Sequence, residues 1–252
     1  MSVLALRLAG PLQSWGVSAR FARRTTETAP TKSGVIGLLA AAQGRERDAD
    51  LSDLAALRFG VRVDQPGTRI RDFQTAHHAV TGKSMPVSER FYLADAVFVA
   101  AVEGEDALID ALYAAVRAPV FLPYLGRRSC PPAEPVDLGV RREADLRHVL
   151  EDEPWMAAAW YQRRLDREPF PRLTVIVEST PDEDPGDMVR DQPLSFDPRH
   201  RRYALRGYRT DTVSVPNPRA RGGTRRSDAH AELTPAHDPT TQLPLLSPLD
   251  GA

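Results

Sequence analysis

The 252-residue chain is poor in the residues that build disulfide bonds and metal sites. Its one cysteine, Cys130, excludes an internal disulfide bond and a zinc site made of cysteines. The six histidines stand at positions 77, 78, 148, 200, 230 and 237, without the spacing of a metal site. We therefore expect no metal and no cofactor.

Lysine is also scarce, because only Lys32 and Lys83 among the 33 basic residues are lysines and the rest are arginines. The net charge of −1 gives no overall reason to expect nucleic acid, although a basic face fits within a neutral total. The planar arginine fork pairs with phosphate and stacks on bases. A GC-rich genome would produce the same bias, so both explanations stay open.

Long apolar runs are missing as well. No stretch approaches the roughly 20 apolar residues of a membrane span. The first residues, MSVLALRLAG, lack the charged start of a signal peptide. We expect a soluble, cytoplasmic protein that makes no membrane contact.

Hydrophobic periodicity and turn residues predict a mixed α+β fold. We expect helices at residues 30–43 and 106–118, with shorter helical pieces within 143–168. Strands are expected at residues 3–8, 59–63, 68–76, 91–102, 173–177 and 203–215, and those at 59–63 and 68–76 are expected to pair as a hairpin. This order fits a ferredoxin-like β-α-β-β-α-β unit.

The chain changes character at residue 216. Six prolines follow, periodicity disappears, and the segment contains RARGGTRR. We predict a domain over residues 1–215 and a Pro- and Arg-rich tail over 216–252 that is disordered or lies on a partner.

An arginine pair stands out in the stretch PVFLPYLGRRSCPP, residues 119–132. Tyr124 and Gly126 set up a turn, Arg127 and Arg128 follow it, and Cys130 with two prolines stiffens the exit. The stretch is either a solvated loop or a loop that presents two arginines to an anion.

A second anion position is expected at the start of the helix that follows Pro30. Thr31, Lys32 and Ser33 stand where free N–H groups and the helix dipole favour negative charge. The glycines of a nucleotide-binding loop are missing upstream, which excludes a P-loop enzyme. A plain helix cap with a solvated lysine is the alternative.

Aromatic residues accompany arginines at four places: Trp15 near Arg20, Arg71 near Phe73, Arg90 beside Phe91 and Tyr92, and Tyr124 near Arg127 and Arg128. Such pairs bind phosphate and stack bases, which favours RNA binding through loops. His77 or His78 is the one candidate base for RNA cleavage, unless both are bystanders in a polar loop.

Three blocks together resemble one family: LRLAGPLQSWG at residues 6–16, PTKSGVIGLLAA at 30–41, and LPYLGRRSCPP at 122–132. Supporting blocks are RDFQTAHH at 71–78 and VRDQPLSF at 189–196. In order and spacing these resemble the CasD family, the small RAMP-type subunit of the type I-E CRISPR surveillance complex Cascade. Residues 143–187 match the family poorly.

The resemblance implies a ferredoxin-like (RRM/RAMP-type) domain with a projecting β-hairpin thumb, here at about residues 77–90. It implies a non-catalytic subunit that caps the 5′ repeat-derived handle of the CRISPR RNA, in antiviral defence. The partners it implies are the Cascade backbone subunit, the large subunit and, indirectly, target DNA. The residues expected to meet RNA are Gln13, Ser14, Trp15, Lys32, Ser33, Arg71, Arg90, Tyr124, Gly126, Arg127 and Arg128.

Two alternatives to this interpretation remain. One is a metal-independent endoribonuclease that processes CRISPR precursor RNA and uses His77 or His78. The other is an interaction protein without direct RNA contact. Trp15 is equally well explained as a core residue beneath its turn.

Overall fold

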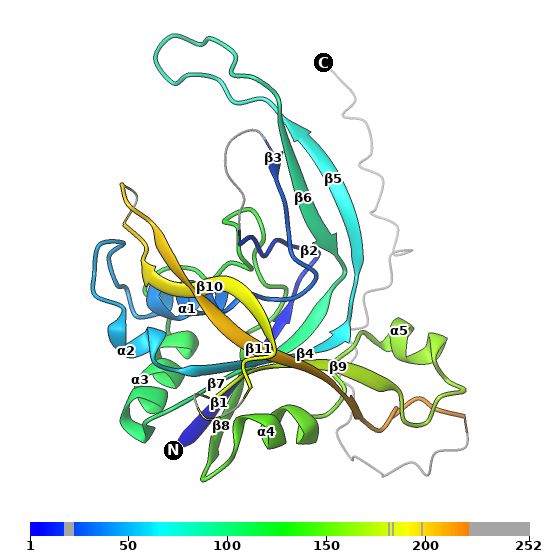
Figure 1. Ribbon diagram of the computed structural model, residues 1–252. Coiled ribbons are helices and arrows are strands. Elements are labelled where there is room, and N and C mark those ends of the chain that lie inside the picture. The colour runs from blue at the N-terminus through cyan, green and yellow to red at the C-terminus, as the bar shows by residue number, and fades with distance from the viewer. Residues whose placement is uncertain (18–22, 181, 183, 198, 222–252) are drawn as a thin grey trace, which may run out of the picture.

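The computed structural model describes residues 1–17, 23–180, 182, 184–197 and 199–221. Within them the fold is mixed α+β, as predicted, and mostly antiparallel (Figure 1). The larger sheet has seven strands in the order β10-β11-β9-β4-β7-β1-β8. These strands are β1 (Ser2–Ala9), β4 (Arg58–Gln65), β7 (Val97–Gly104), β8 (Asp137–Arg142), β9 (Arg172–Glu178), β10 (Asp187–Ser195) and β11 (Arg202–Ser214).

Helices cover both faces of this sheet. On β1, Leu4, Leu6 and Leu8 point into one hydrophobic core, whereas Val3 and Ala5 point into a second, because side chains alternate along a strand. The first core lies beneath α1 (Lys32–Ala42), α2 (Ser52–Ala55) and α3 (Asp106–Arg117). The second lies beneath α4 (Leu146–Asp152), and α5 (Ala159–Arg164) packs beside it.

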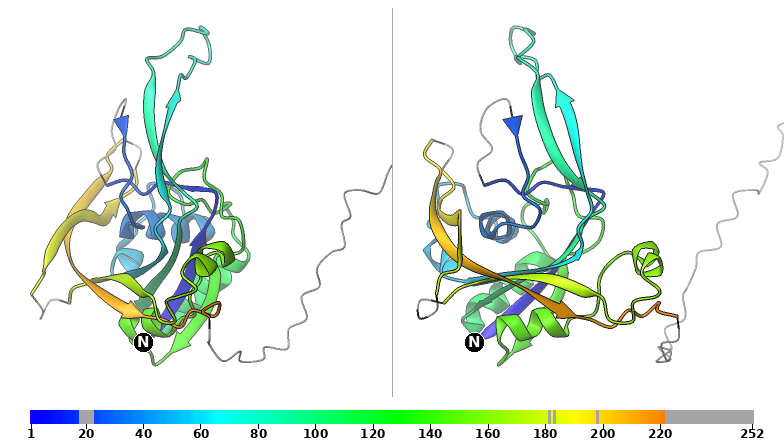
Figure 2. Two further views of the ribbon diagram at one scale, coloured as in Figure 1. Left: turned by 90° about the vertical axis from the view of Figure 1, so that its right-hand side faces the viewer. Right: turned by 45° about the vertical axis from the view of Figure 1, so that its right-hand side comes forward.

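The centre of the sheet follows a simple order. Along the chain the elements run β1-α1-β4-β7-α3-β8, and in space four of these strands lie side by side as β4-β7-β1-β8, each neighbouring pair antiparallel. Both crossing helices, α1 and α3, lie on the same face and contact each other. Strands β9, β11 and β10 extend the sheet beyond β4 and curve toward α1 (Figure 2).

A smaller sheet joins β2 (Leu12–Gln13), β3 (Arg23–Arg24), β5 (Thr68–Gln74) and β6 (Ser88–Ala94). Strands β5 and β6 form a hairpin that extends away from the body of the molecule (Figures 1 and 2). We call residues 68–94 the arm. Its far end is held by a bridge between His77 and Ser84 and by the backbone bond from Gly82 to the His78 carbonyl, 2.9 Å.

The arm corrects two sequence predictions. Strand β4 does not pair with β5, and the apolar run at 91–102 is two strands rather than one, separated by Asp95 with φ of 56°. Strand β4 pairs with β7, and β5 pairs with β6. The two pairs form one continuous two-stranded ribbon, whose first part belongs to the larger sheet and whose second part belongs to the smaller sheet. Gly67 packs there against the Ala94 carbonyl, where a Cβ atom would approach the oxygen to 2.5 Å.

The C-terminal boundary also differs from the prediction. Beyond Val215 the chain stays docked, because Asn217 is 6% exposed and its side-chain amide donates to three carbonyls at the end of α5. Arg221 forms an ion pair with Asp166. The packed domain therefore reaches residue 221, and the rest of the predicted tail lies outside the described residues.

The predicted helix at residues 30–43 is confirmed. Helix α1 begins after Thr31, whose hydroxyl accepts from the Gly34 N–H at 3.2 Å, and it ends before Gly44 with φ of 75°. Cys130 is buried, and burial raises the pKa of its thiol, which makes it an unreactive core residue. Among the helices of the described residues, none is long and apolar enough to cross a membrane.

Candidate functional site

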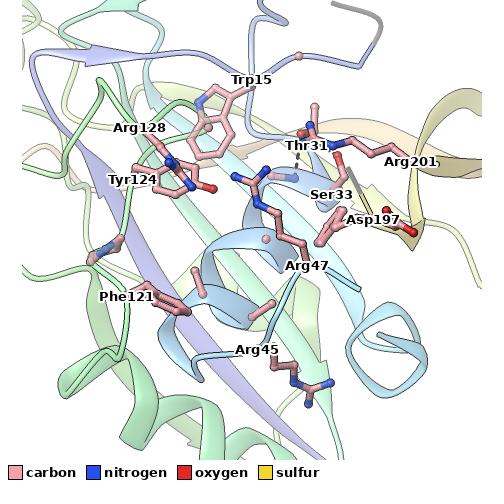
Figure 3. Close-up of a pocket in the computed structure, with 18 of the residues that line it drawn as sticks. Trp15, Thr31, Ser33, Arg45, Arg47, Phe121, Tyr124, Arg128, Asp197 and Arg201 are labelled. Atoms are coloured by element: carbon pink, nitrogen blue, oxygen red, sulfur yellow. Dashed lines mark hydrogen bonds between the residues drawn. The ribbon is translucent and has the colours of Figure 1, made fainter. Parts of the chain in front are cut away.

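A cleft of about 1200 Å³ opens between α1 and the loops that surround it (Figure 3). Its walls are the N-terminal turn and one side of α1, the loop at residues 45–48, the loop at 121–131 and the turn between β10 and β11. These segments are far apart in the sequence, and the fold brings them together around one helix. The shape of the cleft depends on two glycines.

Gly34 and Gly126 allow close backbone contact beside the cleft. A Cβ atom on Gly34 would come within 2.8 Å of the Trp15 ring, so the helix and the indole can pack only without one. Gly126 has φ of 81°, and a Cβ atom there would lie 1.8 Å from the Ser14 carbonyl oxygen. The loop at 121–131 therefore rests directly on the turn that holds Trp15.

Arginine side chains line the cleft from three directions. Figure 3 shows Arg128 beside Tyr124 on one wall, Arg201 reaching toward Thr31 on the other, and Arg47 between them. Arg47, Arg128, Arg199 and Arg201 are exposed and have no carboxylate partner among the residues that the structure describes. Arg45 differs, because it is bound to Asp53.

Acidic residues also line the cleft, so its charge is mixed. They are Glu46, Asp48 and Asp197, and the Asp197 carboxylate accepts from the Arg199 backbone N–H at 2.8 Å. The unpaired arginines nevertheless give the cleft free cationic donors, which suit a phosphate-bearing ligand. The exposed ring of Phe121 and the half-buried ring of Tyr203 also lie along it.

The predicted arginine pair is divided between two roles. Arg127 points away from the cleft: it donates to the carbonyls of Phe91 (3.1 Å) and Arg24 (2.8 Å), and its guanidinium lies 4.8 Å from the Tyr92 ring. It thereby ties the loop to β3 and β6. Arg128 is exposed and lines the cleft. Tyr124, Gly126 and Ser33 line the cleft as well.

The turn at residues 13–15 is buried beneath the cleft. Gln13 is 0% exposed; its amide donates to the carbonyls of Leu8 and Ala96, and its oxygen accepts from the Trp15 indole at 3.1 Å. Trp15 is also 0% exposed, which leaves no face of the ring free to stack a base. Ser14 is 3% exposed and donates to the Phe91 carbonyl. These three buried residues therefore support the wall of the cleft from inside the protein.

Lys32 corrects the prediction of an anion site at the start of α1. Its side chain is 2% exposed and its ammonium lies 2.9 Å from the Glu178 carboxylate. Burial lowers the pKa of Lys32, and the charge of Glu178 opposes that effect. The Lys32 backbone N–H already donates to Asp191 at 2.8 Å, so a protein carboxylate occupies the place predicted for a phosphate.

Arg71 and Arg90 lie on the arm, away from the cleft. The Arg71 guanidinium stacks over Phe73 at 4.8 Å, as predicted from their spacing. Arg90 is half-buried, its Nε atom has no hydrogen-bond partner, and the ring of Phe91 is instead contacted by Arg23 and Arg69. The proposed pairing of Trp15 with Arg20 lies outside the described residues.

Sequence reasoning missed Arg47, Arg199 and Arg201. The last two belong to PRHRRYALR, which begins two residues after the end of the supporting block VRDQPLSF, and this basic run was the available signal. Their position depends on Phe196, which lies 3.7 Å from the place of a Cβ atom on Gly37. Such a contact over a long sequence separation has no local signature.

Neither histidine of the arm is arranged as a base with a helper group. His77 and His78 are exposed, and among the described residues their Nδ1 atoms contact neighbouring groups of the same loop. In the described part of the chain no three His, Cys, Asp or Glu side chains come together as metal ligands.

Comparisons with known proteins show the family of the chain. Residues 3–209 match the family described as "CRISPR-associated protein (Cas_Cas5)". The chain is 37% identical over 170 residues to the CRISPR system Cascade subunit CasD of Escherichia coli (strain K12), a match that covers 59% of this chain and 75% of that protein.

Two solved structures resemble the fold over nearly their whole length. One, described as a crystal structure of a Cas protein, has a TM-score of 0.65 and 41% identity, and covers 88% of this chain and 98% of its own. The other, from a CRISPR RNA-guided surveillance complex, has a TM-score of 0.69 and 36% identity, with 88% and 95% covered. The chain therefore belongs to the Cas5 family of CRISPR-associated proteins and is of the CasD type.

Proposed function

We propose that this chain is a subunit of a type I-E Cascade complex and that its cleft binds the 5′ handle of the CRISPR RNA. One observation carries the proposal: Arg47, Arg128, Arg199 and Arg201 surround the cleft without carboxylate partners in the described residues. A hooked RNA segment presents phosphates and splayed bases at close range. Free guanidinium groups with nearby Tyr124 and Tyr203 suit both.

The arrangement of the chain supports the structural part of this role. We interpret β1-α1-β4-β7-α3-β8 as a ferredoxin-like unit and the arm as the thumb. Arg69 and Arg71 stack on rings along one face of the arm, so the arm offers further cations to RNA. Arg90 and Arg71 would act there rather than in the cleft.

The partners follow from the same proposal. A subunit that caps the handle would join the Cascade backbone subunit to the large subunit and would meet target DNA only through the complex. It would act in the cytoplasm in antiviral defence and would have no catalytic role. The related protein of E. coli is named as a Cascade subunit, and a related structure is a surveillance complex.

Binding of handle RNA tests the cleft. Fluorescence anisotropy would compare an RNA carrying the repeat-derived 5′ segment of the host's guide RNAs with an RNA of scrambled sequence. We expect Arg128→Ala and Arg201→Ala each to weaken handle binding roughly tenfold, since a hydrogen bond to a charged group contributes about 1.5–3 kcal/mol. Arg117→Ala, an exposed arginine on α3, is the matched control and should change nothing.

Equal binding of the handle by wild type and by the double variant Arg128→Ala/Arg201→Ala would reject the cleft as the RNA site. Incubation of labelled repeat RNA with the purified chain tests the second claim. Specific cleavage that disappears in His77→Ala/His78→Ala would show an endoribonuclease and overturn the non-catalytic role.

A further inference from the structure

A second basic and aromatic surface lies on α5, away from the cleft. We propose that this surface binds single-stranded nucleic acid, with an unpaired base stacked on Trp160 and phosphates held by Arg163, Arg164 and Arg167. We call these four residues the α5 face. The proposal is independent of the function proposed for the cleft, because it rests on different residues.

Helical spacing places Trp160, Arg163 and Arg164 on one side of α5, because residues three or four positions apart are neighbours on a helix surface. Arg167 lies in the turn that follows the helix. The opposite side is fixed to the protein: Tyr161 packs edge-on against Trp155 with ring centroids 6.1 Å apart, and the Gln162 amide donates to the Trp155 carbonyl. The α5 face therefore points outward, and all four of its residues are exposed.

The end of α5 is held rigidly, so the α5 face is set before any ligand binds. The side-chain amide of Asn217 donates to the carbonyls of Gln162, Leu165 and Glu168. Arg221 binds the Asp166 carboxylate and donates its backbone N–H to the Asp166 carbonyl. A pre-organised surface loses less conformational entropy on binding.

The charge of this surface favours a polyanion. Asp166 is already bound to Arg221, and within the described residues Glu168 is a nearby acid that forms no ion pair. Arg163, Arg164 and Arg167 have no carboxylate partner in the part of the chain that the structure describes. Arg219 adds a further exposed cation on the docked segment.

An exposed ring distinguishes this surface from a plain basic patch. Trp160 is 48% exposed, although an indole usually becomes buried, and Tyr161 supports it edge-on at 5.6 Å. Phe170, 63% exposed, ends the same segment. Aromatic rings beside arginines form the stacking platforms of proteins that bind single strands, where the bases are free to leave the duplex.

The α5 face and the cleft belong to different sides of the molecule. Helix α5 packs beside the core beneath α4, whereas the cleft lies on α1, above the other core. Figure 1 shows α1 and α5 on opposite sides of the ribbon. A strand on the α5 face would therefore be a second nucleic-acid segment, or a distant part of the same one.

Tryptophan fluorescence tests the proposal directly. Of the three tryptophans, Trp15 and Trp155 are 0% and 4% exposed, so stacking of a base should quench mainly Trp160. Titration with oligothymidylate should give a saturable loss of emission that is absent in Trp160→Phe. The triple variant Arg163→Ala/Arg164→Ala/Arg167→Ala should weaken binding at least tenfold.

Salt provides a second readout. Three phosphate contacts to a single strand predict a slope of about −2 in a plot of log affinity against log salt, so a fourfold rise in salt weakens binding roughly twentyfold. The triple alanine variant should flatten this slope. Arg117→Ala, an exposed arginine on α3 outside both surfaces, is the matched control and should leave both quenching and slope unchanged.

Three results of the titrations would overturn the proposal. They are the absence of saturable quenching at low salt, quenching that persists in Trp160→Phe, and equal binding of oligothymidylate by the triple variant. A duplex or an inorganic polyphosphate that competes as well as the single strand would also reject it, and would indicate a site for negative charge alone, such as an acidic protein surface.

Discussion

Arg127 and Arg128 are neighbours in the sequence, yet their side chains point to different parts of the molecule. Arg127 contacts β3 and β6, whereas Arg128 lines the cleft. Arg127 uses its donors on the carbonyls of Phe91, Arg24 and Thr25, and stacks over Tyr92. Arg128 has no such contacts in the described residues and lines the cleft. One arginine therefore positions the loop and the other remains available to a ligand.

Single alanine substitutions should separate these two roles. Arg127→Ala should lower the free energy of unfolding by about 2 kcal/mol, because it removes charged hydrogen bonds and a cation–π contact. Arg128→Ala should leave stability within about 0.5 kcal/mol of wild type, as most surface changes do, and should weaken RNA binding. Urea unfolding with RNA titration measures both, and a reversed pattern would contradict the assignment.

Two glycines with positive φ provide a second residue-scale test. Gly126→Ala should destabilise the protein by about 3 kcal/mol or more, because strain at φ of 81° adds to a clash with the Ser14 carbonyl. Gly82→Ala, with φ of 67° but nothing within 4 Å, should cost only about 1 kcal/mol. Equal thermal stability of the two variants would mean that the loop does not rest on Ser14 as described.

At the scale of elements, the start of α1 is fixed by a buried ionic cluster. Lys32 binds Glu178 of β9, its backbone N–H binds Asp191 of β10, and Arg206 of β11 forms a two-point pair with Asp191. Glu178 also accepts from the Phe59 N–H on β4. The cluster joins α1 to four strands and so sets the wall of the cleft near Ser33.

Removing one charge of the buried Lys32–Glu178 pair should lower the free energy of unfolding more than removing both charges. Glu178→Gln leaves the Lys32 ammonium buried without its counter-charge and should destabilise the protein by about 3 kcal/mol. The double variant Lys32→Met/Glu178→Gln should recover most of that loss. Chemical unfolding of the single and double variants measures the coupling, and simple additivity of the two changes would argue against the pair.

The burial of Lys32 predicts how the stability of the protein changes at alkaline pH. Its pKa in the folded protein is below 10.5, chiefly through burial, so the unfolded chain binds the proton more tightly. The free energy of unfolding should therefore rise as pH increases from the lowered pKa toward 10.5. Lys32→Met should lack this contribution, so the free energy of unfolding of the wild type should rise relative to that of the variant as pH increases. A difference between the two proteins that does not change with pH would contradict the burial of the ammonium.

Local signals predicted the elements of this fold better than their pairing. The apolar strand at 3–8, the helix at 106–118 and the cap at Thr31 were found because each depends on neighbouring residues. The pairing of β5 with β6 instead of β4 was missed, since register is set by partners far along the chain. Strand β8, DLGVRR, was missed because it lacks a strong apolar pattern.

The candidate site was predicted unevenly for the same reason. Arg128, Tyr124 and Gly126 were found on a loop with a clear sequence signature, and all three line the cleft. Lys32 was expected at the surface, but its burial comes from strands β9 to β11, which no local pattern announces. Arg201 joins the cleft only through that same long-range packing.

At the scale of the whole molecule, the cleft and the arm are connected. The arm continues the β4–β7 pair through the centre of the larger sheet, and Arg127 links the cleft loop to β6 at the base of the arm. If the cleft binds RNA as we propose, that RNA lies against a loop that is tied to the arm. This connection would suit the proposed role of holding the end of a guide RNA and a neighbouring chain together.

Crosslinking in the assembled particle tests the central claim most directly. The chain would be purified with its partner subunits and guide RNA, irradiated, and its RNA-bound peptides identified by mass spectrometry. We predict that peptides containing Arg47, Tyr124 to Arg128, and Arg199 to Tyr203 carry nucleotides of the 5′ handle. Handle nucleotides found on other surfaces, with these three segments free of RNA, would contradict the assignment of the cleft.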